Sequence, residues 1–167
     1  RYDSTLYIRC IDGNEANELP DGWRLMQQIN GDIRARFPRA ITIAEDLRNN
    51  GWLTKPTGEG GAGFHAQWDA NFVHPVRAIV TLLQDEQRSM DAIRQAIAFR
   101  YEGDAFRRIV YSESHDEVAN GKARVPHEID PGNPGSWFAR KRSTLGAAPS
   151  AASRMASPKG SYSDGWQ

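Results

Sequence analysis

The sequence is poor in the residues and runs that mark several classes of protein. It holds a single cysteine, Cys10, so no disulfide can form within the chain, and a reducing compartment such as the cytoplasm is favoured. No apolar run approaches the roughly 18 residues of a membrane span, and no signal peptide is recognisable. The four histidines form no tight pair with one another or with Cys10, which disfavours a metal site.

Neither sign of charge is in excess. The chain carries 21 basic and 21 acidic residues, for a formal net charge of +0. This balance argues against a nucleic acid or an anionic membrane as the partner. Five tryptophans and five tyrosines are present instead, and flat rings with polar edges suit the faces of sugars as well as a hydrophobic core.

Strand and helix patterns alternate along the chain. Residues 22–37 predict a helix with an apolar face, capped by Asp21 and ended by Pro38. That face is formed by Leu25, Ile29, Ile33 and Phe37. Short β-like runs occupy residues 41–43, 64–68 and 108–111, and further helices are expected at 74–83, 89–101 and 136–148. Loops are expected at residues 4–21, 47–62 and 117–135.

This alternation predicts a parallel sheet, either doubly wound or closed into a β/α barrel. The spacing of Asp3, Glu45 and Asp116 fits barrel units of about 31 residues, as one unit with a large loop followed by two units. No apolar strand precedes Tyr2, so we expect the chain to begin inside a structural element. Residues 149–167 are rich in Ser and Ala, and this composition predicts a flexible low-complexity tail.

One glycine-rich segment matches a cofactor motif. Residues 58–63 fit the dinucleotide-binding pattern G-x-G-x-x-G, which requires a strand before it and a helix start after it. Here a loop precedes the glycines and a β-like run follows them, so a mobile loop is the favoured interpretation.

Three carboxyl groups follow three predicted strand ends: Asp3, Glu45 and Asp116. Each alone is typical of a helix cap. Together they suit cleavage of a glycosidic bond, which needs one ionised and one protonated carboxyl group. Arg1 lies on the same strand face as Asp3 and would keep it ionised, whereas Ile43, Ala44 and Trp52 would make a drier surrounding for Glu45.

Four segments resemble the α-amylase superfamily, glycoside hydrolase family 13, and within it the 1,4-α-glucan branching enzymes most closely. Arg1-Tyr2-Asp3 is similar to the family's motif after barrel strand four, and Ile43-Ala44-Glu45-Asp46 to its acid/base motif after strand five. The segment Glu113 to Glu117 resembles the motif after strand seven, and Gly63 to Asp69 the strand-six segment of branching enzymes. The resemblance implies that residues 1–148 are the C-terminal half of a (β/α)8 TIM barrel, strands four to seven, truncated at both ends.

The resemblance also implies roles for single residues. Asp3 would be the nucleophile, Glu45 the general acid/base, and Asp116 the group that stabilises the transition state. His115 would bind the same sugar and Arg1 would orient Asp3. Trp68 would stack on glucan, although a place in the core suits it equally.

The implied reaction is retaining glycosyl transfer on α-1,4-glucan, such as glycogen or amylose, to form α-1,6 branches, with no cofactor and no metal. Two alternatives stay open. One is an α-glucan hydrolase of the amylase or trehalohydrolase type. The other is a catalytically inactive fragment.

Overall fold

The computed structural model describes residues 1–119 and 121–155. Its helices are α1 (Thr5–Arg9), α2 (Pro20–Arg36), α3 (Ala70–Thr81), α4 (Met90–Ala98), α5 (His115–Val118), α6 (Val125–Ile129) and α7 (Trp137–Met155). Its strands are β1 (Ile43–Ala44), β2 (Ala66–Trp68) and β3 (Arg108–Ile109), and 3-10 turns lie between several of these elements. Among these residues, no helix is both long and apolar enough to cross a bilayer.

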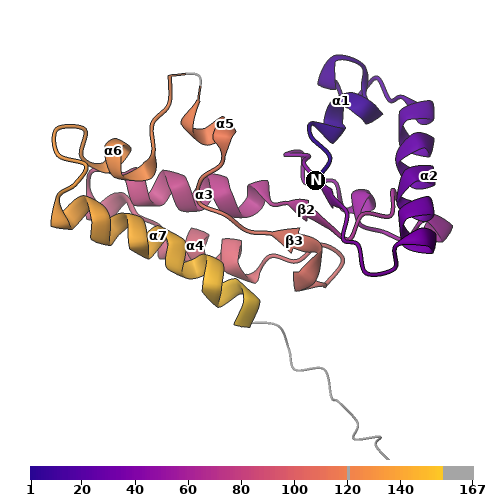
Figure 1. The fold of residues 1–167 in the computed structure, drawn as a ribbon. Coiled ribbons are helices and arrows are strands. Elements are labelled where there is room, and N and C mark those ends of the chain that lie inside the picture. The colour runs from indigo at the N-terminus through magenta and orange to yellow at the C-terminus, as the bar shows by residue number, and fades with distance from the viewer. Residues whose placement is uncertain (120, 156–167) are drawn as a thin grey trace, which may run out of the picture.

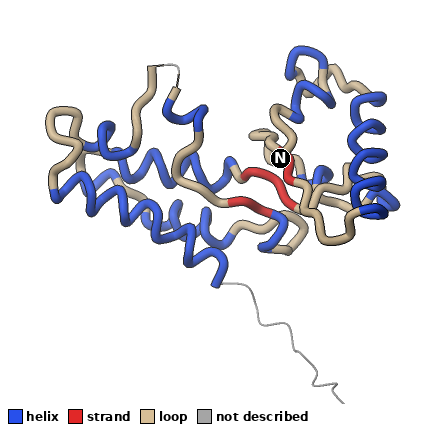
Figure 2. The backbone as a smooth tube through the Cα atoms, viewed as in Figure 1, coloured by secondary structure: helices blue, strands red, loops and turns tan. Residues whose placement is uncertain are grey.

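The strands form one parallel sheet in the order β1-β2-β3. Tyr2 extends it, because its N–H donates to the Ile43 carbonyl (2.8 Å) and its carbonyl accepts from the Glu45 N–H (3.0 Å). Figures 1 and 2 show the strands in the middle, with α1 and α2 on one side and α3, α4 and α7 on the other. The prediction of an α/β fold with a parallel sheet is therefore confirmed.

Helix α2 confirms the predicted helix but buries a different face. Met26 and Asn30 are buried, whereas Leu25 is 52% and Phe37 61% exposed. The reason is a row of α2 side chains that donate hydrogen bonds to successive loop carbonyls: Trp23 to Gly60 (3.0 Å), Gln27 to Gly61 (2.9 Å), Asn30 to Ala62 (2.8 Å) and Arg34 to Gly63 (3.2 Å). The glycine-rich segment, predicted as a mobile loop, is thus hydrogen-bonded along α2.

Other boundaries also differ from those predicted. Residues 5–9 form α1 rather than a loop, and α5 and α6 lie within or at the edge of the loop predicted at 117–135. Helix α2 starts at Pro20, whose fixed φ suits the first turn, and Asp21 lies inside it rather than capping it. The Ser136 hydroxyl does accept from the Ala139 N–H at the start of α7 (3.1 Å), as expected of a cap. Helix α7 continues to Met155, beyond the predicted end at residue 148; the rest of the predicted tail, residues 156–167, lies outside the described residues.

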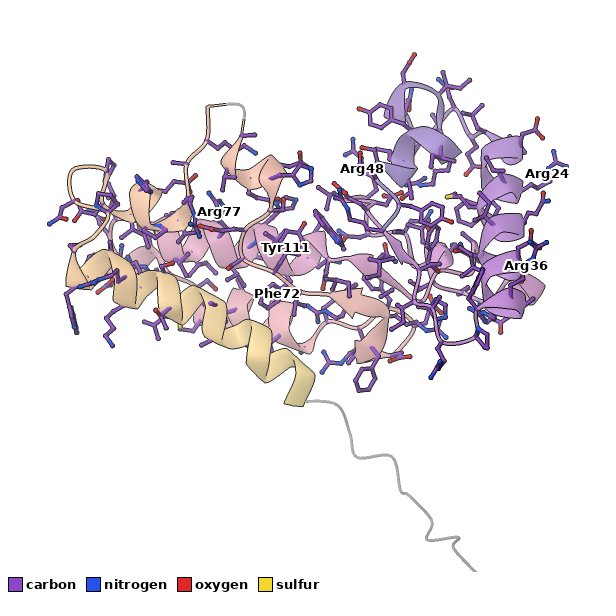
Figure 3. The ribbon with its side chains drawn as sticks, viewed as in Figure 1. Arg24, Arg36, Arg48, Phe72, Arg77 and Tyr111 are labelled. Carbon is purple, nitrogen blue, oxygen red and sulfur yellow. The ribbon has the colours of Figure 1, made fainter. Side chains whose placement is uncertain are left out.

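The core is divided between the two sides of the sheet. On the α2 side, Met26, Ala44, Leu53, Ala62 and Phe64 pack together. On the other side, Phe72, Val76 and Ala96 join α3 to α4, and a further cluster of Val80, Val125, Ile129 and Ala139 joins α3 to α6 and α7. Figure 3 shows Phe72 on α3 between the sheet and α4. These clusters therefore pack the helices against the sheet and against one another.

Two glycines of α2 provide a matched test of this packing. A Cβ at Gly22 would overlap the main-chain carbonyl of Ile8 in α1, whereas one at Gly31 would meet nothing within 4 Å. We expect Gly22→Ala to lower the free energy of unfolding by about 1–3 kcal/mol, because backbone must move. Gly31→Ala is expected to raise it by up to about 1 kcal/mol through helix propensity. Chemical denaturation of both variants checks this, and equal effects would contradict the close contact of α1 and α2.

Candidate active site

The predicted site residues lie at one edge of the sheet. Asp3, Glu45 and Trp68 stand at or directly after the carboxyl ends of the Tyr2 segment, β1 and β2, and the segment that leads to His115 and Asp116 follows β3. Carboxyl ends of parallel strands meet at the same edge. The structure therefore gathers side chains that are up to 115 positions apart, since the first of the predicted site residues is Arg1 and the last is Asp116.

Arg1 connects three of these residues. Its guanidinium donates to an oxygen of Glu45 and lies 2.9 Å from Oδ1 of Asp3. Its Cζ atom also lies 4.9 Å from the centre of the Trp68 ring, in cation–π geometry. The expected proximity of Arg1 and Asp3 is confirmed, and the contact with Glu45 is an addition to it.

Glu45 and Asp3 occupy different environments. Glu45 is 5% exposed, whereas the side chain of Asp3 is 66% exposed. Burial raises the pKa of Glu45 to about 7, assisted by the charge of Asp3 and by a hydrogen bond and charge from Asp116, while Arg1 opposes the shift. The expected dry surrounding of Glu45 is confirmed. Trp52 has another place, half exposed with the Lys55 ammonium 4.0 Å from its ring centre.

The start of α5 positions His115 and Asp116. The Ser114 hydroxyl caps this helix by accepting from the Asp116 N–H (3.2 Å), and it donates to the Glu117 carboxylate. His115 Nε2 lies 3.5 Å from Oδ1 of Asp116, and the His115 ring stands edge-on to Trp68 with centroids 6.1 Å apart. Trp68 therefore borders the site and is only partly buried.

Single ligand atoms of Asp3, Glu45 and His115 lie within 4.8 Å of one another, a spacing compatible with a metal ion. Arg1 already contacts both carboxylates of this group. A cation held there would therefore face a guanidinium at short range, which disfavours metal binding.

Sequence reasoning missed Tyr111 as part of the site. Its ring packs on Trp68 with centroids 4.8 Å apart, and Figure 3 shows it on the segment between β3 and α5. Its buried hydroxyl has no hydrogen-bond partner among the described residues, and burial together with the charges of Glu117, Glu45 and Asp116 raises its pKa. The available signal was its place two residues before Glu113, at the end of the predicted β-like run 108–111.

Glu113 supports the fold next to the site. Its carboxylate accepts from the Val125 N–H (2.6 Å) and pairs with Arg124 (2.9 Å). It thus binds the start of α6 to the segment that carries His115 and Asp116. Arg77, which Figure 3 shows on α3, supports the same region by donating to the Glu117 carbonyl (3.1 Å) and pairing with Glu128 (2.8 Å).

The site is thus a cluster of carboxyl, guanidinium and imidazole side chains at the carboxyl ends of the strands of a parallel sheet. No protein-family model matches the chain. It is 29% identical over 133 residues to the 1,4-alpha-glucan branching enzyme GlgB of Prochlorococcus marinus (strain AS9601), which covers 79% of this chain and 17% of that enzyme. It is 30% identical over 129 residues to the enzyme of the same name from Synechococcus sp. (strain CC9605), with 77% and 16% covered.

The chain thus spans about a sixth of the length of the curated relatives that it matches. Its resemblance to branching enzymes, first noted from the four motifs, is confirmed: the chain is homologous to a segment of enzymes with this name.

The buried carboxyl group gives a pH prediction. Because the pKa of Glu45 is raised from 4.5 to about 7 on folding, its contribution to stability is fully present below pH 4.5 and is lost as the pH rises through 7. Glu45→Gln is neutral at every pH, so its stability relative to wild type should increase from pH 4.5 to 7.5. Urea denaturation across this range measures the difference, with the exposed Glu86→Gln as the control. A difference that stays constant with pH would show that Glu45 is not desolvated.

Two tyrosines allow the unpaired hydroxyl to be tested. Tyr101 donates a hydrogen bond to Oδ1 of Asn49 (3.1 Å), whereas the Tyr111 hydroxyl is without a partner among the described residues. Tyr101→Phe should lower the free energy of unfolding by about 1 kcal/mol. Tyr111→Phe should leave it unchanged or raise it, because no bond is lost and one buried polar group is removed. Thermal and urea denaturation give both values, and a larger loss for Tyr111→Phe would contradict the arrangement.

Proposed function

We propose that residues 1–148 form part of the catalytic barrel of an α-glucan branching enzyme, with Asp3, Glu45 and Asp116 as its catalytic carboxyl groups. The single observation that carries the proposal is the contrast between Glu45 and Asp3. Glu45 is buried with its pKa raised to about 7, and Asp3 is exposed beside the Arg1 guanidinium. Retaining transfer of a glycosyl group needs a proton donor and an ionised nucleophile side by side.

In the proposed reaction, Asp3 attacks the anomeric carbon of an α-1,4-linked glucose while Glu45 protonates the departing oxygen. A glycosyl–Asp3 ester forms, and Glu45 becomes ionised. Glu45 then takes the proton of an incoming glucan 6-hydroxyl, which displaces Asp3 and creates an α-1,6 branch. A carboxyl group with a pKa of about 7 suits both the donation and the acceptance of this proton.

The spacing of the groups supports a retaining course. Carboxyl groups of retaining enzymes lie about 5–5.5 Å apart, whereas inverting enzymes need about 6.5–9.5 Å to admit water. Oxygens of Asp3 and Glu45 lie within 4.8 Å of each other. Asp116, which helps to raise the pKa of Glu45, is proposed to stabilise the positive charge of the transition state, with His115 and Arg1 binding the sugar and orienting Asp3. Trp68, at the border of the cluster, is proposed to stack on the glucan.

The relatives' names favour transfer over the hydrolytic alternative, since those enzymes are named for branching. The inactive-fragment alternative has its own support. Large apolar side chains such as Phe37 (61%) and Ile41 (69%) are exposed, as expected if residues 1–167 alone leave part of a core uncovered. A location in the cytoplasm stays a prediction from the single cysteine.

The nucleophile assignment is tested with the complete reading frame that contains these residues and, in parallel, with residues 1–167 alone. Asp3→Asn should reduce branching of amylose at least roughly a thousandfold, because the covalent step is lost. The matched control is the exposed Asp12→Asn, which should retain activity. Iodine absorbance with chain-length analysis distinguishes branching from hydrolysis. Undiminished branching by Asp3→Asn, or shortened unbranched chains from the wild type, would refute the proposal.

A further inference from the structure

A pocket lies at the start of α2, and none of the predicted site residues lines it. It has a volume of about 330 Å³ and lies between the start of α2 and the loop that follows β1. Its walls include Trp23 and Pro20 from α2, and Asn50 and Trp52 from the loop. Arg9 at the end of α1 and Glu18 before α2 complete them. This volume is within the range of small-ligand sites.

Both tryptophans are held in place before any ligand arrives. Trp23 Nε1 donates to the Gly60 carbonyl (3.0 Å), which fixes the orientation of its ring. The main-chain N–H of Trp52 donates to Oδ1 of Asn50 (3.0 Å), and the Lys55 ammonium lies 4.0 Å from the Trp52 ring centre. The Trp52 residue nevertheless remains 50% exposed. A large ring that is open to solvent is a ready stacking surface.

The charges in the pocket favour a neutral ligand. The Arg9 guanidinium is already paired with Asp46 (2.6 Å) and Glu15 (2.7 Å), and burial keeps it there at 5% exposure. Glu18 adds a carboxylate to the wall. A phosphate or another anion would thus meet a compensated cation and a negative group, which is unfavourable. Hydroxyl groups, in contrast, can bond to Glu18 and to the amide of Asn50.

The pocket is joined to the carboxylate cluster by short, rigid connections. Asp46, the partner of Arg9, directly follows Glu45. The Thr5 hydroxyl at the start of α1 donates to the Glu45 carbonyl (3.0 Å), and α1 leads from Asp3 to the pocket wall at Arg9. Both features stand at the same edge of the sheet.

We propose that this pocket binds a glucose unit of an α-glucan chain, stacked on Trp52 and bordered by Trp23, as a subsite separate from the carboxylate cluster. The inference rests on the proposed function for its substrate class. Stacking on a fixed ring and a few hydroxyl contacts hold a remote part of the chain. Such a subsite aligns a long glucan beside the reacting carboxyl groups.

The test is a titration of the 15N-labelled protein with maltoheptaose, observed at the indole N–H signals of its five tryptophans. Maltoheptaose should shift the signals of Trp52 and Trp23 and leave that of Trp137, which is 69% exposed on α7, unchanged. Trp52→Ala should weaken the affinity about tenfold, Trp52→Phe should retain most of it, and Trp137→Ala should have no effect. Because the Trp52 residue is half exposed and outside the packed core clusters of the described residues, its replacement leaves the fold intact.

Two results would overturn the subsite. One is a shift confined to Trp68, which would locate binding at the carboxylate cluster. The other is an affinity unchanged by Trp52→Ala. The readout is binding rather than catalysis, so the subsite can fail while Asp3→Asn still abolishes branching, and it can hold if the branching assignment fails.

Discussion

The parallel alignment of four short segments is the constraint on which the rest of the structure depends. Tyr2 pairs with β1, β1 with β2 and β2 with β3, each in the order of the chain. Because all run in one direction, whatever follows each segment arrives at the same edge. Asp3, Glu45 and the segment with Asp116 meet at this edge, although they are far apart in the sequence. A reversed segment would remove its side chain from the site.

The extent of burial distinguishes Glu45 from Asp3, the two carboxyl groups that Arg1 contacts at that edge. Arg1 contacts both Asp3 and Glu45, so the presence of a cation does not distinguish them. Burial does: Glu45 loses its water and its pKa rises to about 7, with burial outweighing the attraction of Arg1. Asp3 keeps most of its surface in solvent. The same guanidinium therefore contacts one buried and one exposed carboxyl group, and burial raises the pKa of the buried one, Glu45.

The sequence could predict the features that depend on local pattern. Alternating elements predicted the parallel sheet, and residues after strand ends predicted the cluster, because both follow from backbone geometry. The buried face of α2 could not be predicted from apolar spacing. Asn30 and Gln27 are oriented by carbonyls some thirty positions away, and this pairing overrides the Leu25 and Phe37 stripe. Tyr111 was missed for a similar reason: only the folded chain shows that its hydroxyl is left without a partner among the described residues.

Helix α1 links the two candidate sites, although its segment was expected to be a loop. Arg9 and Asp46 form an ion pair in which the side chains are 5% and 0% exposed, and loss of one partner would leave a buried charge. That pair connects the wall of the tryptophan pocket to the residue after Glu45. Thr5 connects the other end of α1 to the Glu45 main chain. The pocket wall at Arg9 and the carboxyl group of Glu45 are therefore joined through α1 and the residue after Glu45, and not only through the loop that carries Trp52.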